Sequence, residues 1–517
     1  MFLSGMSPMA EPYQPLPSPY QAVWILSSIP FAIVATILVM PFVMLAGSRF
    51  GLVDQPDRRR KPGQAPIPRV GGLAMVLGAI LVAVPALVLA NGLPLVHHFW
   101  IGIGLLLVVI VGVVDDRFGM RGRHKLLGQV VASLLIVLPG GQSIEAVQVA
   151  GWDIPLGPWG AFLAIFLLVG AMNSANLLDG MDGFLASVGL VSAATILAVA
   201  FIRDLPGVMA ATCLFMGGLA GFLVFNLPPA RVYLGDCGSM LVGASLALLA
   251  IGCGHPGEHA ANVSLALPAG VLFLPILDTT AAIVRRGLTG RSIYSPDRSH
   301  LHHCLKLAGI GPHGCMMLSM AIGLGVGAMV VLGQAIHDDR PAWAAMAAMA
   351  ATLILTGLFG RAEVRLVFRR LKALVFPKPS ASGRSDADMA LHLHGSGPWE
   401  ELWTQMVSVG REAGVTALTL DIDMPWANES FHGRWDNGKS ADSEPDQWRL
   451  ELPIVADDRV IARFRVESSH ASRPFEQVSA RFQPVLERLK SLAMALDLVS
   501  QRENDGIIDS TGGVSEP

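Results

Sequence analysis

Charged residues are scarce in this chain. Asp, Glu, Lys and Arg make up 15% of its 517 residues, hydrophobic residues make up 52%, and the mean hydropathy is +0.53. This balance is far from that of a soluble globular protein and is typical of a protein that crosses a membrane several times. The small net charge of −3 hides an uneven distribution, because charges are sparse before residue 361 and dense after it.

Cysteine is also rare, and its placement argues against two kinds of scaffold. The five cysteines lie in or beside apolar segments and form no C-x-x-C pair. They are Cys213, Cys237, Cys253, Cys304 and Cys315. This pattern indicates neither a disulfide framework nor a thiolate zinc site.

The first twenty residues contain neither Lys nor Arg. A cleavable signal peptide begins with a positively charged region, so we expect none, and the first apolar helix should act as its own insertion signal. The sequence also contains no visible internal repeat.

Long apolar runs, in contrast, fill the first two thirds of the chain. Eleven segments are long enough, or nearly so, to span a bilayer, which takes about 20 helical residues. They cover residues 22–47, 70–90, 99–114, 126–140, 155–172, 184–202, 207–225, 239–253, 262–284, 314–335 and 342–360. We therefore expect an all-α polytopic membrane domain over residues 22–360, after an extracytoplasmic segment at 1–21.

The charges in the loops fit this count. If the loops alternate sides, nearly all their Lys and Arg residues fall on one side, and only Arg203 and Arg340 fall on the other. By the positive-inside rule the first side is cytoplasmic, so the N-terminus lies outside and the C-terminus inside a bacterial inner membrane. The polar motifs lie on that cytoplasmic side. A transporter would place its polar groups near the bilayer midplane.

The charged last third predicts a separate soluble part. Residues 361–375 have the pattern of a basic amphipathic helix or of an extension of the last span. Residues 377–398 have the composition of a linker. We therefore expect residues 361–398 to connect the two parts. Residues 399–500 predict a small α+β domain. Its expected elements are helices at 399–413 and 473–497 and strands at 415–422, 448–455 and 459–467. The tail at 501–517 is polar and is expected to be disordered.

Asp115 and Asp116 end an apolar run and are followed by Arg117, Arg121, Arg123 and Lys125. A carboxylate inside a bilayer costs a few kcal/mol, so a pair at the membrane edge beside cations indicates a site for a metal and phosphates. The alternative is a flanking charge cluster that only fixes orientation.

Four polar residues recur every third position in the stretch 173–183: Asn173, Asn176, Asp179 and Asp182. A three-residue step drifts around a straight helix by about 60° each time. The glycines at 180 and 183 predict that the helix ends near Asp179 and that the chain bends, so that both aspartates face one site. A simple helix cap with an Asp-Gly turn explains only one of the four.

Three other motifs carry single acidic residues or a basic run. Asp236, in Gly235 to Ser239, either caps the following helix or binds a cation. Asp278 lies within an apolar run, where an ionisable residue is a functional candidate. The run 58–61 of three arginines and Lys61 serves either the site or anionic lipid.

The segment 297–303 holds Arg298 and three histidines, His300, His302 and His303. Histidines in a cytoplasmic loop suggest phosphate contacts or a metal. Zinc is one option, but magnesium held by oxygen ligands and substrate phosphates fits the surrounding carboxylates better.

Together these motifs resemble the polyprenyl-phosphate N-acetylhexosamine-1-phosphate transferases, and most of all the bacterial undecaprenyl-phosphate N-acetylglucosamine-1-phosphate transferases. Five motifs occur in the family's order between about residues 20 and 360. They are Asp115 to Phe118 with Lys125, Asn173 to Gly183, Gly235 to Ser239, Pro275 to Asp278 with Arg285 and Arg286, and Asp297 to His303. One departure is that Pro62 or Gly63 stands where the family often has a histidine.

The resemblance implies a role for each matching position. Asp236 would bind catalytic Mg²⁺, for which Mn²⁺ can substitute, with Asn176 as a second ligand. Asp115 and Asp116 would be the essential acidic pair, with the choice between base, nucleophile and positioning left open. Asn173, Asp179 and Asp182 would line the nucleotide-sugar site, the last two as catalytic residues. Contacts to phosphates or the leaving group would come from Lys61, Lys125, Arg298, His300, His302 and His303.

The implied reaction is transfer of N-acetylglucosamine-1-phosphate from UDP-GlcNAc to undecaprenyl phosphate, with release of UMP, as the first lipid-linked step of a cell-envelope polysaccharide. The alternatives are another UDP-N-acetylhexosamine or UDP-MurNAc-pentapeptide as donor and, from a different class, a proton-coupled transporter. No nucleic-acid partner is expected. Downstream glycosyltransferases or a second copy of the chain are the expected protein partners.

Overall fold

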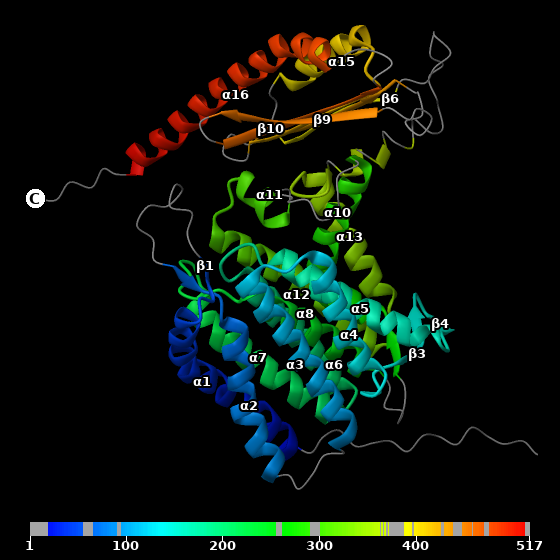
Figure 1. Cartoon of the computed structure of the whole chain (residues 1–517). Helices are drawn as coiled ribbons and strands as arrows, with labels where there is room; N and C mark the ends of the chain where they lie inside the picture. The colour runs from blue at the N-terminus through cyan, green and yellow to red at the C-terminus, as the bar shows by residue number, and fades with distance from the viewer. Residues whose placement is uncertain are drawn as a thin grey trace, which may run out of the picture. The chain divides into compact units, whose positions relative to one another are not determined.

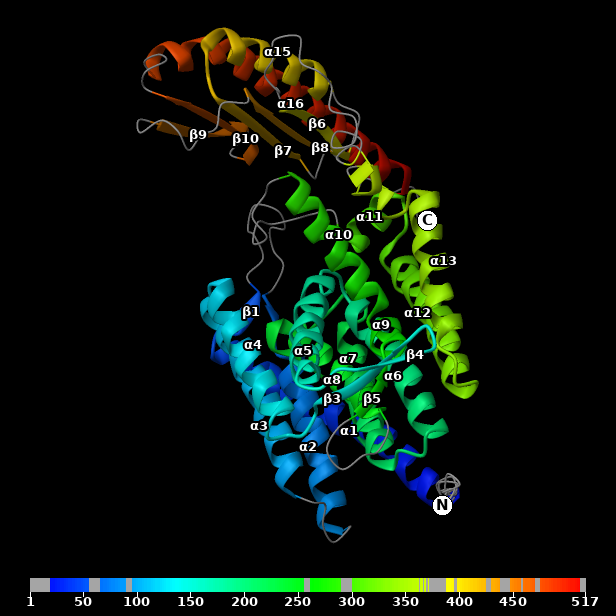
Figure 2. The same ribbon diagram turned by 90° about the vertical axis from the view of Figure 1, so that its right-hand side faces the viewer.

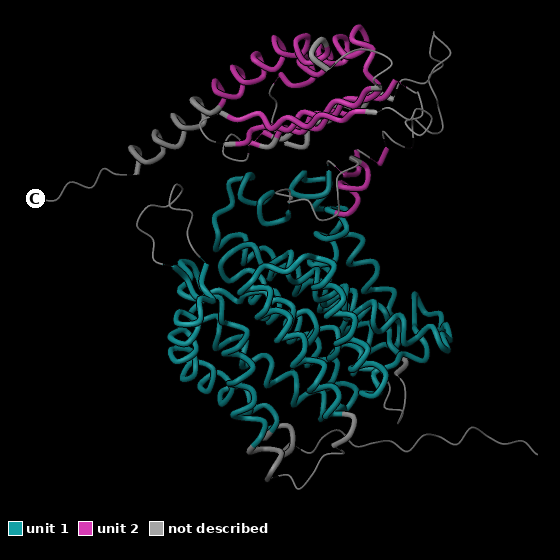
Figure 3. The backbone as a smooth tube through the Cα atoms, viewed as in Figure 1, with its two compact units in different colours: residues 1–282, 300–361 teal, residues 283–299, 362–517 magenta. Residues whose placement is uncertain are grey.

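Figure 1 shows the computed structural model of the chain. The structure describes residues 19–54, 66–89, 95–254, 261–289, 300–361, 363–365, 367, 368, 371, 387–394, 398–424, 429–437, 447–456, 459–469 and 475–511. The chain forms two compact units, coloured in Figure 3. The first comprises residues 1–282 and 300–361, and the second comprises residues 283–299 and 362–517.

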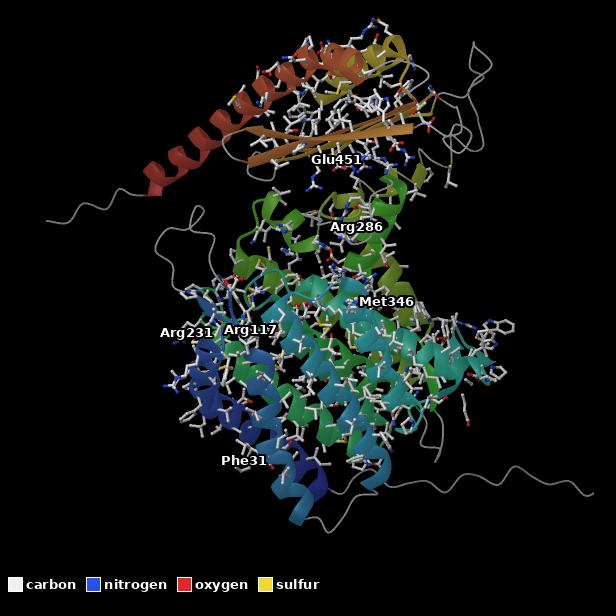
Figure 4. All side chains as sticks on the ribbon, in the orientation of Figure 1. Phe31, Arg117, Arg231, Arg286, Met346 and Glu451 are labelled. Atoms are coloured by element: carbon white, nitrogen blue, oxygen red, sulfur yellow. The ribbon has the colours of Figure 1, made fainter. Side chains whose placement is uncertain are left out.

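The first unit is a bundle of apolar helices. These are α1 (Pro19–Arg49), α2 (Gly71–Leu89), α3 (Leu95–Phe118), α4 (Gly122–Val137), α5 (Trp159–Leu178), α6 (Phe184–Ile202), α7 (Pro206–Asn226), α8 (Gly235–Gly252), α9 (Ala266–Val271), α11 (Leu301–Leu307), α12 (Pro312–Ala335) and α13 (Arg340–Thr356), while α10 (Phe273–Thr289) runs from this unit into the second. Most side chains of α6 and α8 are buried. The outer helix α1 exposes apolar side chains such as Phe31 (Figure 4). An apolar outer surface of this kind suits a lipid environment.

Seven described helices are long and apolar enough to cross a membrane: α1, α3, α5, α6, α7, α8 and α12. The expected count of eleven spans is therefore not confirmed. The segments expected at 70–90, 126–140 and 342–360 do form helices α2, α4 and α13. However, α4 and α13 have only 16 and 17 residues, and the apolar part of α2 whose side chains are described covers Gly71–Val84.

The single span expected at 262–284 is wrong. The structure places there a short strand, β5 (Ala261–Ser264), then α9 and then α10. Pro275 explains the break between the two helices. It has no backbone N–H, and its ring would clash with the carbonyl of Val271, the residue at which α9 ends.

A three-stranded sheet that the sequence did not predict joins several helix ends. Its strands β3 (Ile144–Val149), β4 (Trp152–Pro155) and β5 have the order β4-β3-β5. Strand β3 pairs antiparallel with β4 and parallel with β5. At the start of α13, the buried carboxylate of Asp339 accepts hydrogen bonds from the backbone N–H groups of Ala150 (3.1 Å) and Gly151 (2.8 Å). This contact fastens the β3–β4 turn to the α12–α13 connection.

The second unit contains a five-stranded antiparallel sheet. Its strands are β6 (Ala387–His394), β7 (Ala417–Met424), β8 (Glu429–Asp436), β9 (Gln447–Ala456) and β10 (Arg459–Ser469), in the order β6-β8-β7-β10-β9. Helices α15 (Trp399–Ala413) and α16 (Phe475–Thr511) cover one face of the sheet (Figure 2). Leu418, Leu420 and Ile422 of β7 are fully buried, as alternation along a strand requires. The two helices and three strands expected in this part of the chain are present, as α15, α16, β7, β9 and β10.

Other details of the second unit differ from expectation. Strand β6 lies in the segment expected to be a linker, where Ala387, Met389 and Leu391 alternate with Asp388, Ala390 and His392 between Ser- and Gly-rich flanks. Strand β8 was not expected, because Gly433 interrupts its short apolar pattern. Helix α16 continues to Thr511, into the predicted disordered tail, since Gln501 to Glu503 are good helix formers.

The helix expected near 361–375 is present, since the described residues between 361 and 371 are helical. It is not an extension of the preceding helix. Helix α13 ends at Thr356, and Gly357 follows it in the left-handed conformation (φ 76°).

Candidate active site

Polar side chains meet where four helix ends of the first unit come together. Helix α3 ends after Asp115 and Asp116, and α4 begins just before Lys125. Helix α5 carries Asn176 in its last turn, and α8 carries Asp236 in its first. Arg117 and Arg231 lie at this same end of the bundle (Figure 4). The sheet β4-β3-β5 follows the opposite ends of α4 and α8, so the polar cluster and that sheet lie at opposite ends of the bundle.

Lys125 is the centre of the cluster. Its Nζ lies 2.8 Å from Asp115 Oδ2 and 3.0 Å from Asp236 Oδ2, and it donates to Asn176 Oδ1 at 3.1 Å. Asn176 in turn donates through Nδ2 to Asp236 Oδ1 (2.6 Å) and to Ser239 Oγ (2.8 Å). Three separate helices therefore supply oxygen ligands to one cation.

Asp116 has a different environment from its neighbour. Its two carboxylate oxygens accept the backbone N–H groups of Asp236 (3.0 Å) and Cys237 (3.2 Å), in the first turn of α8. A carboxylate there satisfies free N–H groups and complements the helix dipole. Gly235 makes the approach possible. It has φ 75°, and a Cβ added to it would lie 2.7 Å from Asp116 Oδ2.

A cavity of about 330 Å³ opens beside this cluster. Its wall is rich in oxygen atoms and consists of Asp54, Arg69, Asp116, Asn176, Asp179, Gly180, Met181, Asp182, Asn226, Tyr233, Leu234, Gly235 and Asp236. Burial, and then the nearby carboxylates of Asp236, Asp116 and Asp182, raise the pKa of Asp179 to about 7. A wall with this many acidic groups favours a cation.

The predicted bend after α5 is confirmed. The helix ends at Leu178, and Asp179 is its C-cap. Asp182 Oδ2 then accepts the backbone N–H of Ala230 (3.0 Å), and Asn226 Oδ1 accepts that of Gly183 (2.8 Å). These bonds hold the turn so that both aspartates line the cavity.

Asn173 does not lie in the cavity wall with Asp179 and Asp182. Its Nδ2 donates to Gln129 Oε1 (2.7 Å) and to the carbonyl of Val169 (2.8 Å), and it is not among the cavity-lining residues. It lies one helical turn before Asn176, and its contact with the nucleotide sugar stays a prediction. Its contact is with α4, which it ties to α5.

The three histidines lie beside the turn rather than in the cavity wall. The ring of His302 packs against Gly180, where an added Cβ would lie 2.4 Å from Cε1. His303 lies against His302, with ring centroids 4.2 Å apart. Burial, and then the neighbouring His303 and His300, lower the pKa of His302 to about 3, so this ring is neutral near pH 7. His302 Nδ1 is buried and has no hydrogen-bond partner among the described residues.

Two expected site residues, Lys61 and Arg298, lie outside the described residues, as do 55–60 and 290–297. The structure adds Tyr233, which the motifs did not single out, and places Asp54 and Arg69, which flank the basic run 58–61, in the cavity wall. Arg69 forms an ion pair with Asp54 and a backbone bridge with Tyr233, which brings both into the cavity wall. The sequence signal for Arg69 was the stretch from Pro66 to Gly72, in which Val70 separates Arg69 from two glycines.

The donor set suits a hard divalent cation. Mg²⁺ prefers oxygen ligands and is usually bound by one or two carboxylates plus substrate phosphates. Carboxylates and two side-chain amides surround the cavity, whereas the thiol of Cys237 is fully buried. Within the described ranges, no three His, Cys, Asp or Glu side chains converge on a single metal position. The residues therefore fit a metal shared with substrate phosphates.

Comparison with known proteins agrees with this geometry. The sequence profile described as "Glycosyl transferase family 4" matches residues 98–254, which include both acidic motifs, Lys125 and Asp236. A decaprenyl-phosphate N-acetylglucosaminephosphotransferase of Mycobacterium tuberculosis (strain H37Rv) is 33% identical over 343 residues, which cover 61% of this chain and 83% of that protein. The chain belongs to glycosyl transferase family 4.

Two further relatives have related names. A probable undecaprenyl-phosphate N-acetylglucosaminyl 1-phosphate transferase of Bacillus subtilis (strain 168) is 30% identical over 56% of this chain and 80% of its own length. An undecaprenyl-phosphate alpha-N-acetylglucosaminyl 1-phosphate transferase of Escherichia coli (strain K12) is 28% identical over 53% of this chain and 74% of its own length.

The family 4 chain is therefore a multi-pass membrane phosphotransferase of the polyprenyl-phosphate N-acetylglucosamine-1-phosphate transferase group. The predicted resemblance is confirmed. Membership of a transferase family also argues against the proton-coupled transporter.

Proposed function

We propose that this enzyme transfers N-acetylglucosamine-1-phosphate from UDP-GlcNAc to undecaprenyl phosphate. The products are undecaprenyl-diphosphate-GlcNAc and UMP, and the reaction starts a cell-envelope polysaccharide. The observation that carries the proposal is the Lys125 cluster, in which Asp115, Asn176 and Asp236 surround one cation beside an acidic cavity. The names of the relatives support the choice of sugar and lipid.

The chemistry is attack by a lipid phosphate oxygen on the β-phosphorus of the nucleotide sugar. The new P–O bond forms as the bond to the UMP oxygen breaks, and UMP leaves with the electron pair. A phosphate monoester is largely dianionic near pH 7, so the nucleophile needs no strong base. The enzyme instead has to neutralise and align two anions.

Lys125 and a divalent cation would neutralise these charges. Asp236 and Asn176 would hold Mg²⁺, or Mn²⁺ in its place, and the bound ion would stabilise charge on the pyrophosphate oxygens. Asp115 orients Lys125 through their ion pair, and Asp116 orients Asp236 by binding the first turn of α8.

The remaining residues would recognise the substrates. Asp179 and Asp182 lie in the cavity wall, where they can contact the nucleotide sugar. His300, His302 and His303 would contact phosphates from beside the turn, joined by Arg298 and Lys61. The site would face the cytoplasm, where nucleotide sugars are made, as the loop charges predict.

The test is UMP release by the purified full-length chain in detergent, given UDP-GlcNAc, undecaprenyl phosphate and Mg²⁺, beside the Asp236→Ala variant. Lipid-dependent release that disappears in the variant and in EDTA supports the proposal. Release only with another UDP-N-acetylhexosamine, or with UDP-MurNAc-pentapeptide, would retain the reaction and change the donor. No release with any nucleotide sugar would refute it.

A further inference from the structure

Asp278 is a buried carboxylate to which the proposed reaction gives no role. It lies on α10 directly after the apolar residues 273–277 and is only 1% exposed. A carboxylate in such surroundings is costly unless its oxygens are paired. The groups that bind the Asp278 carboxylate therefore indicate the role of this residue.

Both oxygens of Asp278 bind the start of α11. Oδ2 lies 2.8 Å from His300 Nδ1, and Oδ1 accepts the backbone N–H of Leu301 at 2.7 Å. His300 is itself only 6% exposed. The carboxylate thus joins α10 to the histidine segment, residues 300–303, although residues 290–299 separate the two in the sequence.

His300 lies between Asp278 and His302, which packs beside the cavity. Its ring is parallel to that of His302, with 2° between the planes and 6.2 Å between the centroids. His302 in turn packs on Gly180, beside the cavity residue Asp179. All these residues belong to the first unit. A change in the geometry of His300 would therefore reach the turn that carries Asp179 and Asp182.

We propose that Asp278 is a positioning residue that fixes the tautomer and orientation of His300 and holds the histidine segment against the Asp179–Asp182 turn. An ionised carboxylate can only accept, so His300 Nδ1 carries the proton and Nε2 is the nitrogen left for substrate. The proposal rests on the proposed function, in which the histidines contact phosphate.

Asp278→Asn is the most informative variant. The amide oxygen can still accept the Leu301 N–H, so α11 keeps its anchor. The amide N–H₂ group, in contrast, meets His300 Nδ1 as a donor and favours the opposite tautomer. Asp339→Asn is the matched control, because Asp339 is equally buried and also accepts from backbone N–H groups and a ring nitrogen, Trp343 Nε1, but at the other end of the bundle.

The experiment measures lipid-dependent UMP release and thermal stability for the full-length chain with Asp278→Asn, His300→Gln, both together, and Asp339→Asn. We expect Asp278→Asn to lower kcat about 10- to 100-fold, as loss of an orienting carboxylate typically does, with KM for UDP-GlcNAc within about threefold of the wild type. The double variant should be no worse than His300→Gln alone. Asp339→Asn should lower the melting temperature and leave kcat unchanged.

Three results would overturn the proposal: unchanged kcat in Asp278→Asn, additive losses in the double variant, or an equal kcat loss in Asp339→Asn. If Asp278→Asn does not fold, Asp278→Glu, which retains the charge, replaces it. A folded Glu variant no more active than His300→Gln would also contradict the idea. A wild-type chain that releases no UMP refutes the proposed function, whereas an active wild type with an unaffected Asp278→Asn refutes only the positioning role.

Discussion

At the scale of single residues, the adjacent Asp115 and Asp116 have separate tasks. Asp115 binds the side chain of Lys125, while Asp116 binds the backbone at the start of α8. The sequence predicted a shared role for the pair, because it places them side by side. On a helix, neighbouring side chains diverge by about 100°, and this divergence separates their partners.

Lys125→Met tests the central cation. The change removes the charge that Asp115, Asn176 and Asp236 surround and leaves three oxygen ligands facing each other. We expect kcat for UMP release to fall roughly 100- to 1000-fold, the usual cost of losing one group that stabilises transition-state charge. Arg117→Met, which changes an exposed cation at the end of α3, should stay near wild-type activity. Equal losses in both variants would contradict a specific role for Lys125.

Asp179→Asn tests whether the ionised carboxylate of Asp179 lowers the stability of the folded chain. The pKa of Asp179 in the folded chain is about 7, above its ordinary value of 3.8. The folded state therefore binds the proton more tightly than the unfolded state, so stability falls as the pH rises from 3.8 to about 7, and the full loss is present above pH 7. Without metal, Asp179→Asn should raise the melting temperature by about 2–4 °C at pH 8.5 and have less effect at pH 5.5.

The control for that comparison is Asp153→Asn on the exposed strand β4, with EDTA present throughout. It should change the melting temperature little at either pH. A gain for Asp179→Asn that is as large at pH 5.5 as at pH 8.5 would show that charge is not its cause.

At the scale of elements, strand β8 and helix α15 fit together through one glycine. A Cβ at Gly433 would lie 2.5 Å from the ring of Trp403, which is fully buried. Gly433→Ala should therefore cost about 1–3 kcal/mol of stability in the second unit, as overpacking usually does. Proteolysis of residues 399–500 should become faster, while UMP release is unchanged. Thr419→Ala, on the other face of the sheet, is the control.

The elements also show what could be predicted from the sequence. Long apolar helices such as α6 and α7, and the Trp399–Ala413 helix, follow from local pattern and were placed within a few residues. The acidic motifs were identified because carboxylates are costly beside a membrane. Strand β5 was missed because its partner β3 is distant in the sequence, and Gln129 was missed because only its contact with Asn173 reveals it.

At the scale of the whole molecule, every described residue that lines the cavity belongs to the first unit. A chain that ends at residue 376 retains those residues and also Glu363, whose buried ion pair with Arg285 holds the end of α10. We expect this shortened chain to release UMP at a rate within about threefold of the full chain, because activity belongs to the site rather than to the appended fold. Complete loss of activity in a stable, folded truncation would show that the second unit takes part in catalysis.

The sheet β4-β3-β5 and the Asp339 contacts have a mechanical consequence. They tie together the connections after α4, α8 and α12 at the end of the bundle that lies away from the cavity. Helices fastened at one end can spread only at the other. We therefore expect these helices to move least at the sheet and most at the end that carries the cavity.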